Sequence, residues 1–172
     1  MTAKKILFIV LDGISDRPCP ALRGGTPLSC AKKPVLDKFA AEGICGIMDT
    51  IAPGIRPGSD TAHLALLGYD PYKYYTGRGP LECVGTGIDM KAGMIGFRCN
   101  YATLSPEGKI IDRRAGRIHD TEALSKAIQE GIDLLKFGVR VTFRSGAGHR
   151  AALALEGEGL SHCVSSNDPK KE

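Results

Sequence analysis

Two short segments of this 172-residue chain carry residues that could do chemistry together. An apolar run over 5–11 ends abruptly in Asp12 and Gly13, and the segment 57–64 places Ser59 after a Pro-Gly turn, where an apolar helix begins. A serine at a helix N-terminus faces unpaired backbone N–H groups, which favour phosphate. A carboxylate beside it suits a cation such as Mn²⁺ or Zn²⁺. Together these residues predict metal-assisted phosphoryl chemistry, with Ser59 as nucleophile and metal ligand and Asp12 as metal ligand.

The edge of a parallel sheet would bring these two residues together. The run 4–11 has the continuous apolar character of a strand covered on both faces, and residues 44–50 read as a second strand after a helix that Pro34 opens. A right-handed crossover would make the two strands parallel and bring Asp12 and Ser59 to one edge. Without that convergence, Ser59 is an ordinary helix cap and Asp12 belongs to an ordinary Asp-Gly turn.

The sequence changes character after Pro71, where an aromatic and glycine-rich stretch begins. The patterns that follow predict a small antiparallel α+β unit. Its expected parts are two β-like runs at 87–95 and 97–104 separated at Gly96, a helix capped by Asp120 with Ala123, Leu124, Ala127 and Ile128 on its apolar face, and two paired strands at 139–144 and 149–156.

Five basic residues in this second half are candidates for binding an anion. Arg113, Arg114 and Arg117 form the densest cationic cluster, and the glycine between them favours a loop over a helix. His149 and Arg150 begin a strand after a glycine turn. Arginine can grip phosphate or carboxylate with two parallel hydrogen bonds, so the cluster predicts a substrate clamp. The alternative for all five is a solvated surface.

Composition restricts the partners. The net charge is +4 and the pI about 8.7, but the basic residues are spread along the chain and do not alternate with aromatic ones, so nucleic acid is not the expected partner. The longest apolar run is far too short to span a membrane. Six cysteines without a C-x-x-C pair or a signal peptide favour reduced thiols. We expect a soluble, cytoplasmic protein with a small phosphorylated substrate.

Several motifs together resemble one family. The chain is similar to the archaeal-type 2,3-bisphosphoglycerate-independent phosphoglycerate mutases of the alkaline phosphatase superfamily. The matching stretches are Leu11-Asp12-Gly13, Pro57-Gly58-Ser59-Asp60-Thr61-Ala62-His63-Leu64, Gly68-Tyr69-Asp70-Pro71, Gly77-Arg78-Gly79-Pro80-Leu81-Glu82, Asp112-Arg113-Arg114-Ala115-Gly116-Arg117, His149-Arg150 and Asn167-Asp168-Pro169.

The resemblance implies an α/β fold with a partial parallel-sheet, phosphatase-like core and an inserted small α+β domain. Residues 1–85 would be the N-terminal part of the metal-binding core, 86–166 the inserted substrate-binding domain, and 167–172 the start of the return linker. The front portion of a mutase is therefore the expected organisation of this chain.

The resemblance also implies a mechanism. Two divalent ions, usually Mn²⁺ with Zn²⁺ or Co²⁺ as alternatives, would activate Ser59 to take the phosphoryl group from 3-phosphoglycerate and return it to the 2-oxygen, without 2,3-bisphosphoglycerate. Arg113, Arg114, Arg117, His149 and Arg150 would hold the substrate, and closure would exclude water.

Family members are longer than this chain, and their remaining Asp and His metal ligands follow the inserted domain. We therefore expect the chain to be inactive alone, either as a truncated product or as one half of a split enzyme with a complementing C-terminal chain. We also expect Leu7, Ile9 and the Ser59 helix to lack part of their packing. Two alternatives stay open. One is a phosphohydrolase on the same scaffold, and the other is a non-catalytic fragment that binds phosphorylated metabolites or a partner chain.

Overall fold

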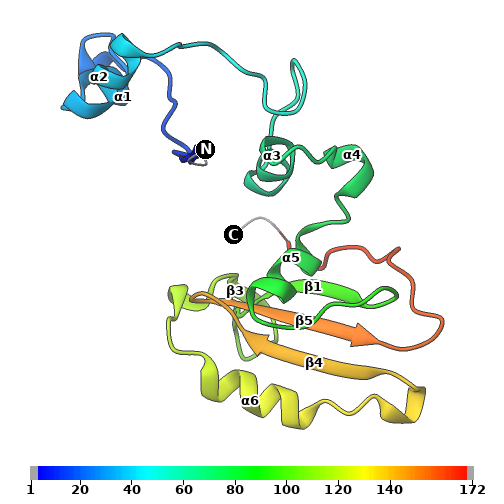
Figure 1. Cartoon of the computed structure of the whole chain (residues 1–172). Helices are drawn as coiled ribbons and strands as arrows, with labels where there is room; N and C mark the ends of the chain where they lie inside the picture. The colour runs from blue at the N-terminus through cyan, green and yellow to red at the C-terminus, as the bar shows by residue number, and fades with distance from the viewer. Residues whose placement is uncertain (1–3, 170–172) are drawn as a thin grey trace. The chain divides into compact units, whose positions relative to one another are not determined.

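The chain changes architecture after Lys73. The computed structural model describes residues 4–169 and separates into a first unit that ends at Lys73 and a second unit that follows it (Figure 1). The sequence predicts this boundary at residue 85 instead. The structure differs because helix α5 (Arg78–Gly85) packs against strand β1 (Ile95–Asn100) and so belongs to the second unit.

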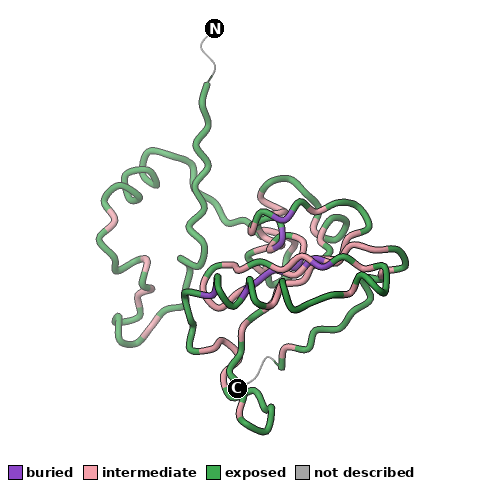
Figure 2. Tube along the Cα trace, turned by 90° about the horizontal axis from the view of Figure 1, so that it is seen from below, coloured by how far each residue is buried: buried purple, intermediate pink, exposed green. Residues whose placement is uncertain are grey.

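The first unit consists of short helices joined by irregular segments. Helix α2 begins with Pro34 at its first position and ends at Gly43, as the sequence predicts. None of the described residues of this unit is buried, and the trace that leads from the N-terminus in Figure 2 is green. Its helices are η1 (Pro20–Leu22), α1 (Pro27–Cys30), α2 (Pro34–Glu42), α3 (Ser59–Leu66) and α4 (Pro71–Tyr74).

The parallel strands predicted at 4–11 and 44–50 are not formed. Neither segment is assigned to a strand, and Ile6 and Leu7 are 92% and 83% exposed. An extended segment becomes a strand only when its N–H and C=O groups pair with a neighbour, and an apolar run of this kind needs cover on both faces. The predicted partial parallel sheet is therefore not seen within the described part of the first unit.

The second unit is built on a three-stranded antiparallel sheet. Strand β5 (Arg150–Glu156) lies between β1 and β4 (Arg140–Ser145), and Leu153 pairs with Phe97 on one side and Phe143 on the other. The hairpin predicted from residue alternation is thus confirmed. The remaining elements are β2 (Thr103–Leu104), β3 (Ile110–Asp112), η2 (Ala115–Arg117), α6 (Glu122–Gly131) and η3 (Leu135–Phe137).

Helix α5 covers one face of this sheet through very small residues. Cys83, Ile88, Ala152 and Ala154 form the buried core between them. The backbones of α5 and β1 approach so closely at Gly79 that a Cβ there would lie 1.8 Å from the carbonyl oxygen of Gly96. Gly96, expected to separate two strands, therefore lies inside β1, where the absence of a side chain makes room for the helix.

Helix α6 is held to the sheet by polar side chains. Gln129 donates to the carbonyl of Val141 (3.2 Å) and accepts from the N–H of Phe143 (2.6 Å), so its amide occupies the free edge of β4. Ser125 is buried and hydrogen-bonds the hydroxyl of Tyr101. Leu124, predicted to face the core, is 46% exposed. The helix therefore presents a polar face to the sheet.

The helices within residues 4–169 are all too short or too polar to cross a membrane.

Candidate active site

The structure brings Asp12 and Ser59 together within the first unit. Ser59 is the first residue of α3, and its hydroxyl donates to Oδ2 of Asp12 at 2.9 Å. Asp12 precedes Gly13, whose φ of 76° turns the chain away from the apolar run. The juxtaposition that the sequence predicts is therefore present, although the parallel strands expected to produce it are not formed.

The hydroxyl of Ser59 is not used as a helix cap. Gly58 holds the N-cap position, and its N–H donates to the hydroxyl of Thr61 at 3.0 Å. Thr61 also returns a hydrogen bond to the carbonyl of Gly58. Because this local pair closes the first turn of the helix, the side chain of Ser59 is left to face Asp12. The interpretation of Ser59 as an ordinary cap is therefore wrong.

Two oxygen ligands fit part of a divalent metal site. A carboxylate and a hydroxyl 2.9 Å apart can both bind one hard cation. Among residues 4–169, His, Cys, Asp and Glu side chains nowhere gather in a group of three that could hold a metal ion. Asp12 and Ser59 would thus supply two ligands and leave the others to be provided from elsewhere.

In the second unit, the arginine cluster lies on a loop that starts where β3 ends. The carboxylate of Asp112 accepts the backbone N–H groups of Arg114 (2.8 Å) and Gly116 (2.5 Å). Ala115, Gly116 and Arg117 all have a left-handed backbone, with φ of 45°, 62° and 58°. For the two residues with a side chain this conformation costs about 1–2 kcal/mol each. These residues form the short 3-10 turn η2, which the left-handed Gly116 interrupts, so the arginines lie on a strained loop and not on a regular helix, as the sequence predicts.

Arg113 differs from its neighbours. Its Nε and Nη2 donate to the two carboxylate oxygens of Asp168 at 3.1 Å and 2.6 Å. Both side chains are mostly buried, with 19% and 31% exposed. This paired geometry is the one that arginine uses for a phosphate or carboxylate ligand, but here a carboxylate of the same chain occupies it. The structure therefore anchors Arg113 to the segment that follows β5.

Arg114 and Arg117 line a hollow of about 340 Å³ together with Ile111, Asp112 and Gly116. His149 is close enough for their charges to act on it. Burial lowers the pKa of His149, and the positive charges of Arg150, Arg114, Arg117 and Arg98 lower it further. The positive potential that lowers this pKa would also attract an anionic ligand. Four of the five residues predicted to hold the substrate, namely Arg114, Arg117, His149 and Arg150, therefore lie in one cationic region. Arg98, which the sequence did not single out, belongs to the same region.

The low pKa of His149 gives a prediction for its titration. We expect a midpoint below the ordinary value of about 6.5 when its ring signals are followed by NMR. Replacing Arg114 with Ala should raise the midpoint because it removes a nearby positive charge, whereas Arg140→Ala, at the opposite end of the sheet, should not change it. Since the folded state resists protonation, the stability of the second unit should fall as the pH drops through about 6.5. A midpoint at or above 6.5 would contradict this assignment.

Sequence reasoning missed Asp112, Asp168 and Arg98. The sequence does carry a signal for Asp112. An aspartate just before a glycine-containing loop often closes a turn, because its carboxylate can accept the backbone N–H groups a few residues further along. The partnership of Arg113 with Asp168 joins residues far apart in the sequence, so the sequence offers no local pattern for it.

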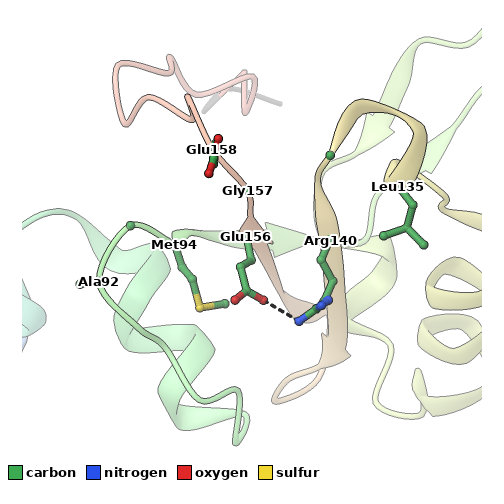
Figure 3. A pocket seen from close by; sticks show the side chains of 9 residues that line it. Ala92, Met94, Leu135, Arg140, Glu156, Gly157 and Glu158 are labelled. Atoms are coloured by element: carbon green, nitrogen blue, oxygen red, sulfur yellow. Dashed lines mark hydrogen bonds and ion pairs between the residues drawn. The ribbon is translucent and has the colours of Figure 1, made fainter.

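A second hollow of about 440 Å³ lies at the other end of the sheet (Figure 3). Arg140 and Glu156 form an ion pair across it at 3.0 Å, with Met94, Leu135 and Glu158 around them. It holds none of the predicted site residues.

Comparison with known proteins identifies the family. Residues 40–172 match the family model of 2,3-bisphosphoglycerate-independent phosphoglycerate mutase. The chain belongs to this family. A 2,3-bisphosphoglycerate-independent phosphoglycerate mutase from Methanoculleus marisnigri is 69% identical over all of this chain, which covers 42% of that protein.

Two solved structures are also similar. A cofactor-independent phosphoglycerate mutase from Thermoplasma acidophilum is 45% identical, with a TM-score of 0.54 over 95% of this chain and 42% of its own. The PH0037 protein from Pyrococcus horikoshii is 34% identical, with a TM-score of 0.70 over 84% of this chain and 35% of its own. The chain therefore spans about 42% of the length of the mutase relatives that it matches.

Proposed function

We propose that this chain supplies the phosphoryl-accepting serine and the anion-binding cluster of a phosphoglycerate mutase that interconverts 3-phosphoglycerate and 2-phosphoglycerate. The observation that carries the proposal is the hydrogen bond from Ser59 to Asp12, because it leaves the hydroxyl of Ser59 outside the helix cap and beside a carboxylate. A bond from Oγ of Ser59 to phosphorus would form as the phosphorus–oxygen bond at C3 breaks. The serine proton would leave, and the glycerate oxygen would take one up. The reverse transfer to the 2-oxygen would restore Ser59.

Asp12 and Ser59 would bind divalent ions, with Mn²⁺ as our first choice and Zn²⁺ or Co²⁺ as alternatives. Such ions make a serine hydroxyl a stronger nucleophile and offset charge on the transferred phosphoryl group. Further ligands would come from the part of the family's length that this chain does not cover, in the same protein or in a complementing C-terminal chain.

Arg114, Arg117, His149 and Arg150 would hold the phosphate and carboxylate of the substrate. Their shared cationic region and the low pKa of His149 support this assignment. We assign Arg113 a positioning role, because Asp168 already occupies its guanidinium group.

The exposed apolar segments of the first unit support the proposal of a phosphatase-like core. Residues 4–11 and 44–50 would become parallel strands of a phosphatase-like sheet when the rest of the family's length covers them, and the second unit would be a domain inserted into that core. The need for that cover is why we expect this chain to be inactive alone. Six free thiols support a reducing compartment, so we place the protein in the cytoplasm.

A chimera tests the proposed function. Residues 1–172 would replace the matching part of the Methanoculleus marisnigri relative, whose remaining length would be kept. We expect the chimera to interconvert the two phosphoglycerates in the presence of Mn²⁺, and we expect the isolated chain not to do so. An inactive chimera beside an active relative would overturn the proposal. Release of inorganic phosphate in place of mutase activity would indicate a phosphohydrolase.

A further inference from the structure

We propose that Asp112 is the positioning residue of the arginine loop, defined as residues 112–117. It acts through the backbone: its two carboxylate oxygens hold the left-handed turn that presents Arg114 and Arg117 on one hollow. The identity of the ligand in that hollow rests on the proposed function, whereas the role of Asp112 in shaping the loop does not.

The two oxygens of Asp112 accept hydrogen bonds from different residues of the loop. Oδ1 accepts the N–H of Arg114 at 2.8 Å and Oδ2 accepts that of Gly116 at 2.5 Å. Because both oxygens are acceptors only while the group is ionised, neither a protonated carboxyl nor an asparagine amide can accept both bonds with the same geometry. These two bonds also lower the pKa of Asp112, and the charges of Arg114 and His149 contribute to the shift.

The backbone of the loop is strained. Ala115 and Arg117 hold positive φ values of 45° and 58°, which residues with a side chain rarely adopt. Such a conformation persists only where its surroundings fix it. The bonds to Asp112 enclose the loop on one side, and the N–H of Arg117 closes it by donating to the carbonyl of Arg114 at 2.8 Å.

The carboxylate of Asp112 lies next to a region that would bind an anion. Asp112 lines the same hollow as Arg114 and Arg117, where a bare negative charge would repel phosphate. Its two oxygens are directed at backbone N–H groups, which offset that charge. Asp112 can therefore lie beside the anion site and organise it without contacting the ligand.

The loop has a second anchor at Arg113. The guanidinium of Arg113 is held by Asp168 from outside the loop, so the loop is fixed by a carboxylate at each of two points. Arg113 faces Asp168, whereas Arg114 and Arg117 line the hollow. Within residues 112–117, Arg113 therefore anchors the loop, whereas Arg114 and Arg117 are available to bind the ligand.

The test compares Asp112→Asn with the wild-type chain by NMR. Left-handed residues give strong nuclear Overhauser effects between their own N–H and Hα, so the loop conformation is read without any ligand. We expect these signals at residues 115–117 in the wild type and their loss in Asp112→Asn. The dissociation constants of 3-phosphoglycerate and of inorganic phosphate, used as separate probes, should rise at least about tenfold.

A matched control is available in the same unit. Asp133 also closes a turn by accepting a backbone N–H, that of Leu135 at 2.9 Å, but Leu135 lines the second hollow and not the hollow of the arginine loop. Asp133→Asn should change neither the arginine loop nor binding of the two probes. The double variant Arg114→Ala/Arg117→Ala should keep the left-handed signals and lose binding, which separates presentation of the arginines from shaping of the loop.

Each outcome decides the proposal. Retention of the left-handed signals in Asp112→Asn would overturn it, whether or not the affinity changes. If the wild type binds neither probe, the proposed function fails for this chain, and the signals of residues 115–117 still decide the role of Asp112. If Asp112→Asn does not fold, acid titration of the wild type decides instead: the left-handed signals should vanish as the Asp112 carboxyl takes up its proton, at a pH below the range of ordinary aspartates. Their persistence beyond that point would overturn the proposal.

Discussion

Replacing Ser59 with Ala in the chimera is expected to reduce mutase activity by at least about 10⁴-fold, as is typical when a catalytic nucleophile is removed. The physical reason is that the substitution removes the hydroxyl that lies beside Asp12 and would accept the phosphoryl group. The measurement is the rate of conversion of 3-phosphoglycerate, together with the intact mass of the protein after brief incubation with it. The wild-type chimera should gain the mass of one phosphoryl group, and the variant should not.

Ser29→Ala is the matched control for this variant. Ser29 also carries a hydroxyl in a helix of the first unit, but that hydroxyl accepts the N–H of Thr26 and belongs to the cap of α1. Its loss should weaken the helix and leave the phosphoryl adduct in place. An adduct that still forms in Ser59→Ala would place the nucleophile at another residue.

Gly79→Ala is expected to destabilise the second unit by about 3 kcal/mol or more. The added Cβ would lie 1.8 Å from the carbonyl oxygen of Gly96 and 2.9 Å from Cα of Phe97, both of which are backbone atoms of β1. Neither can move aside as a flexible side chain could, so α5 would have to lift from the sheet and uncover Cys83. Urea unfolding followed by circular dichroism measures the change.

Gly85→Ala provides the comparison within the same helix. A Cβ at Gly85 would have no neighbour within 4 Å, and alanine favours the helix more than glycine does. The free energy of unfolding should therefore rise, by roughly 0.5–1 kcal/mol. Equal losses in the two variants would show that helix α5 does not depend on its close approach to β1.

The sequence predicts best what depends on local patterns. Alternation along 139–144 and 149–156 identifies the β4–β5 hairpin, and the Pro-Gly turn before Ser59 correctly marks the start of α3. Prediction from the sequence fails where an element depends on partners that are distant along the chain. The boundary after Lys73 depends on the contact of α5 with β1, and the strands expected at 4–11 and 44–50 need neighbours that the described part of the first unit does not offer.

The candidate site divides in the same way. The meeting of Asp12 and Ser59 follows from two motifs that are each visible in the sequence. The separate roles of Arg113 and Arg114 are invisible there, because they depend on Asp168 and on two backbone N–H groups. Helix α6 shows the same limit. Its apolar residues predict the face that packs on the sheet, whereas the structure holds the helix by hydrogen bonds from Gln129 to β4 and between Ser125 and Tyr101.

The amide of Gln129 has a consequence for how molecules of this protein behave in a crowded solution. A sheet whose outermost strand leaves its backbone groups unpaired invites a strand from another molecule to join it, which leads to aggregation. Gln129 hydrogen-bonds the C=O of Val141 and the N–H of Phe143, as one residue of such an incoming strand would. These two backbone groups are therefore no longer open to another molecule. A single side chain thereby helps each copy to remain separate from its neighbours.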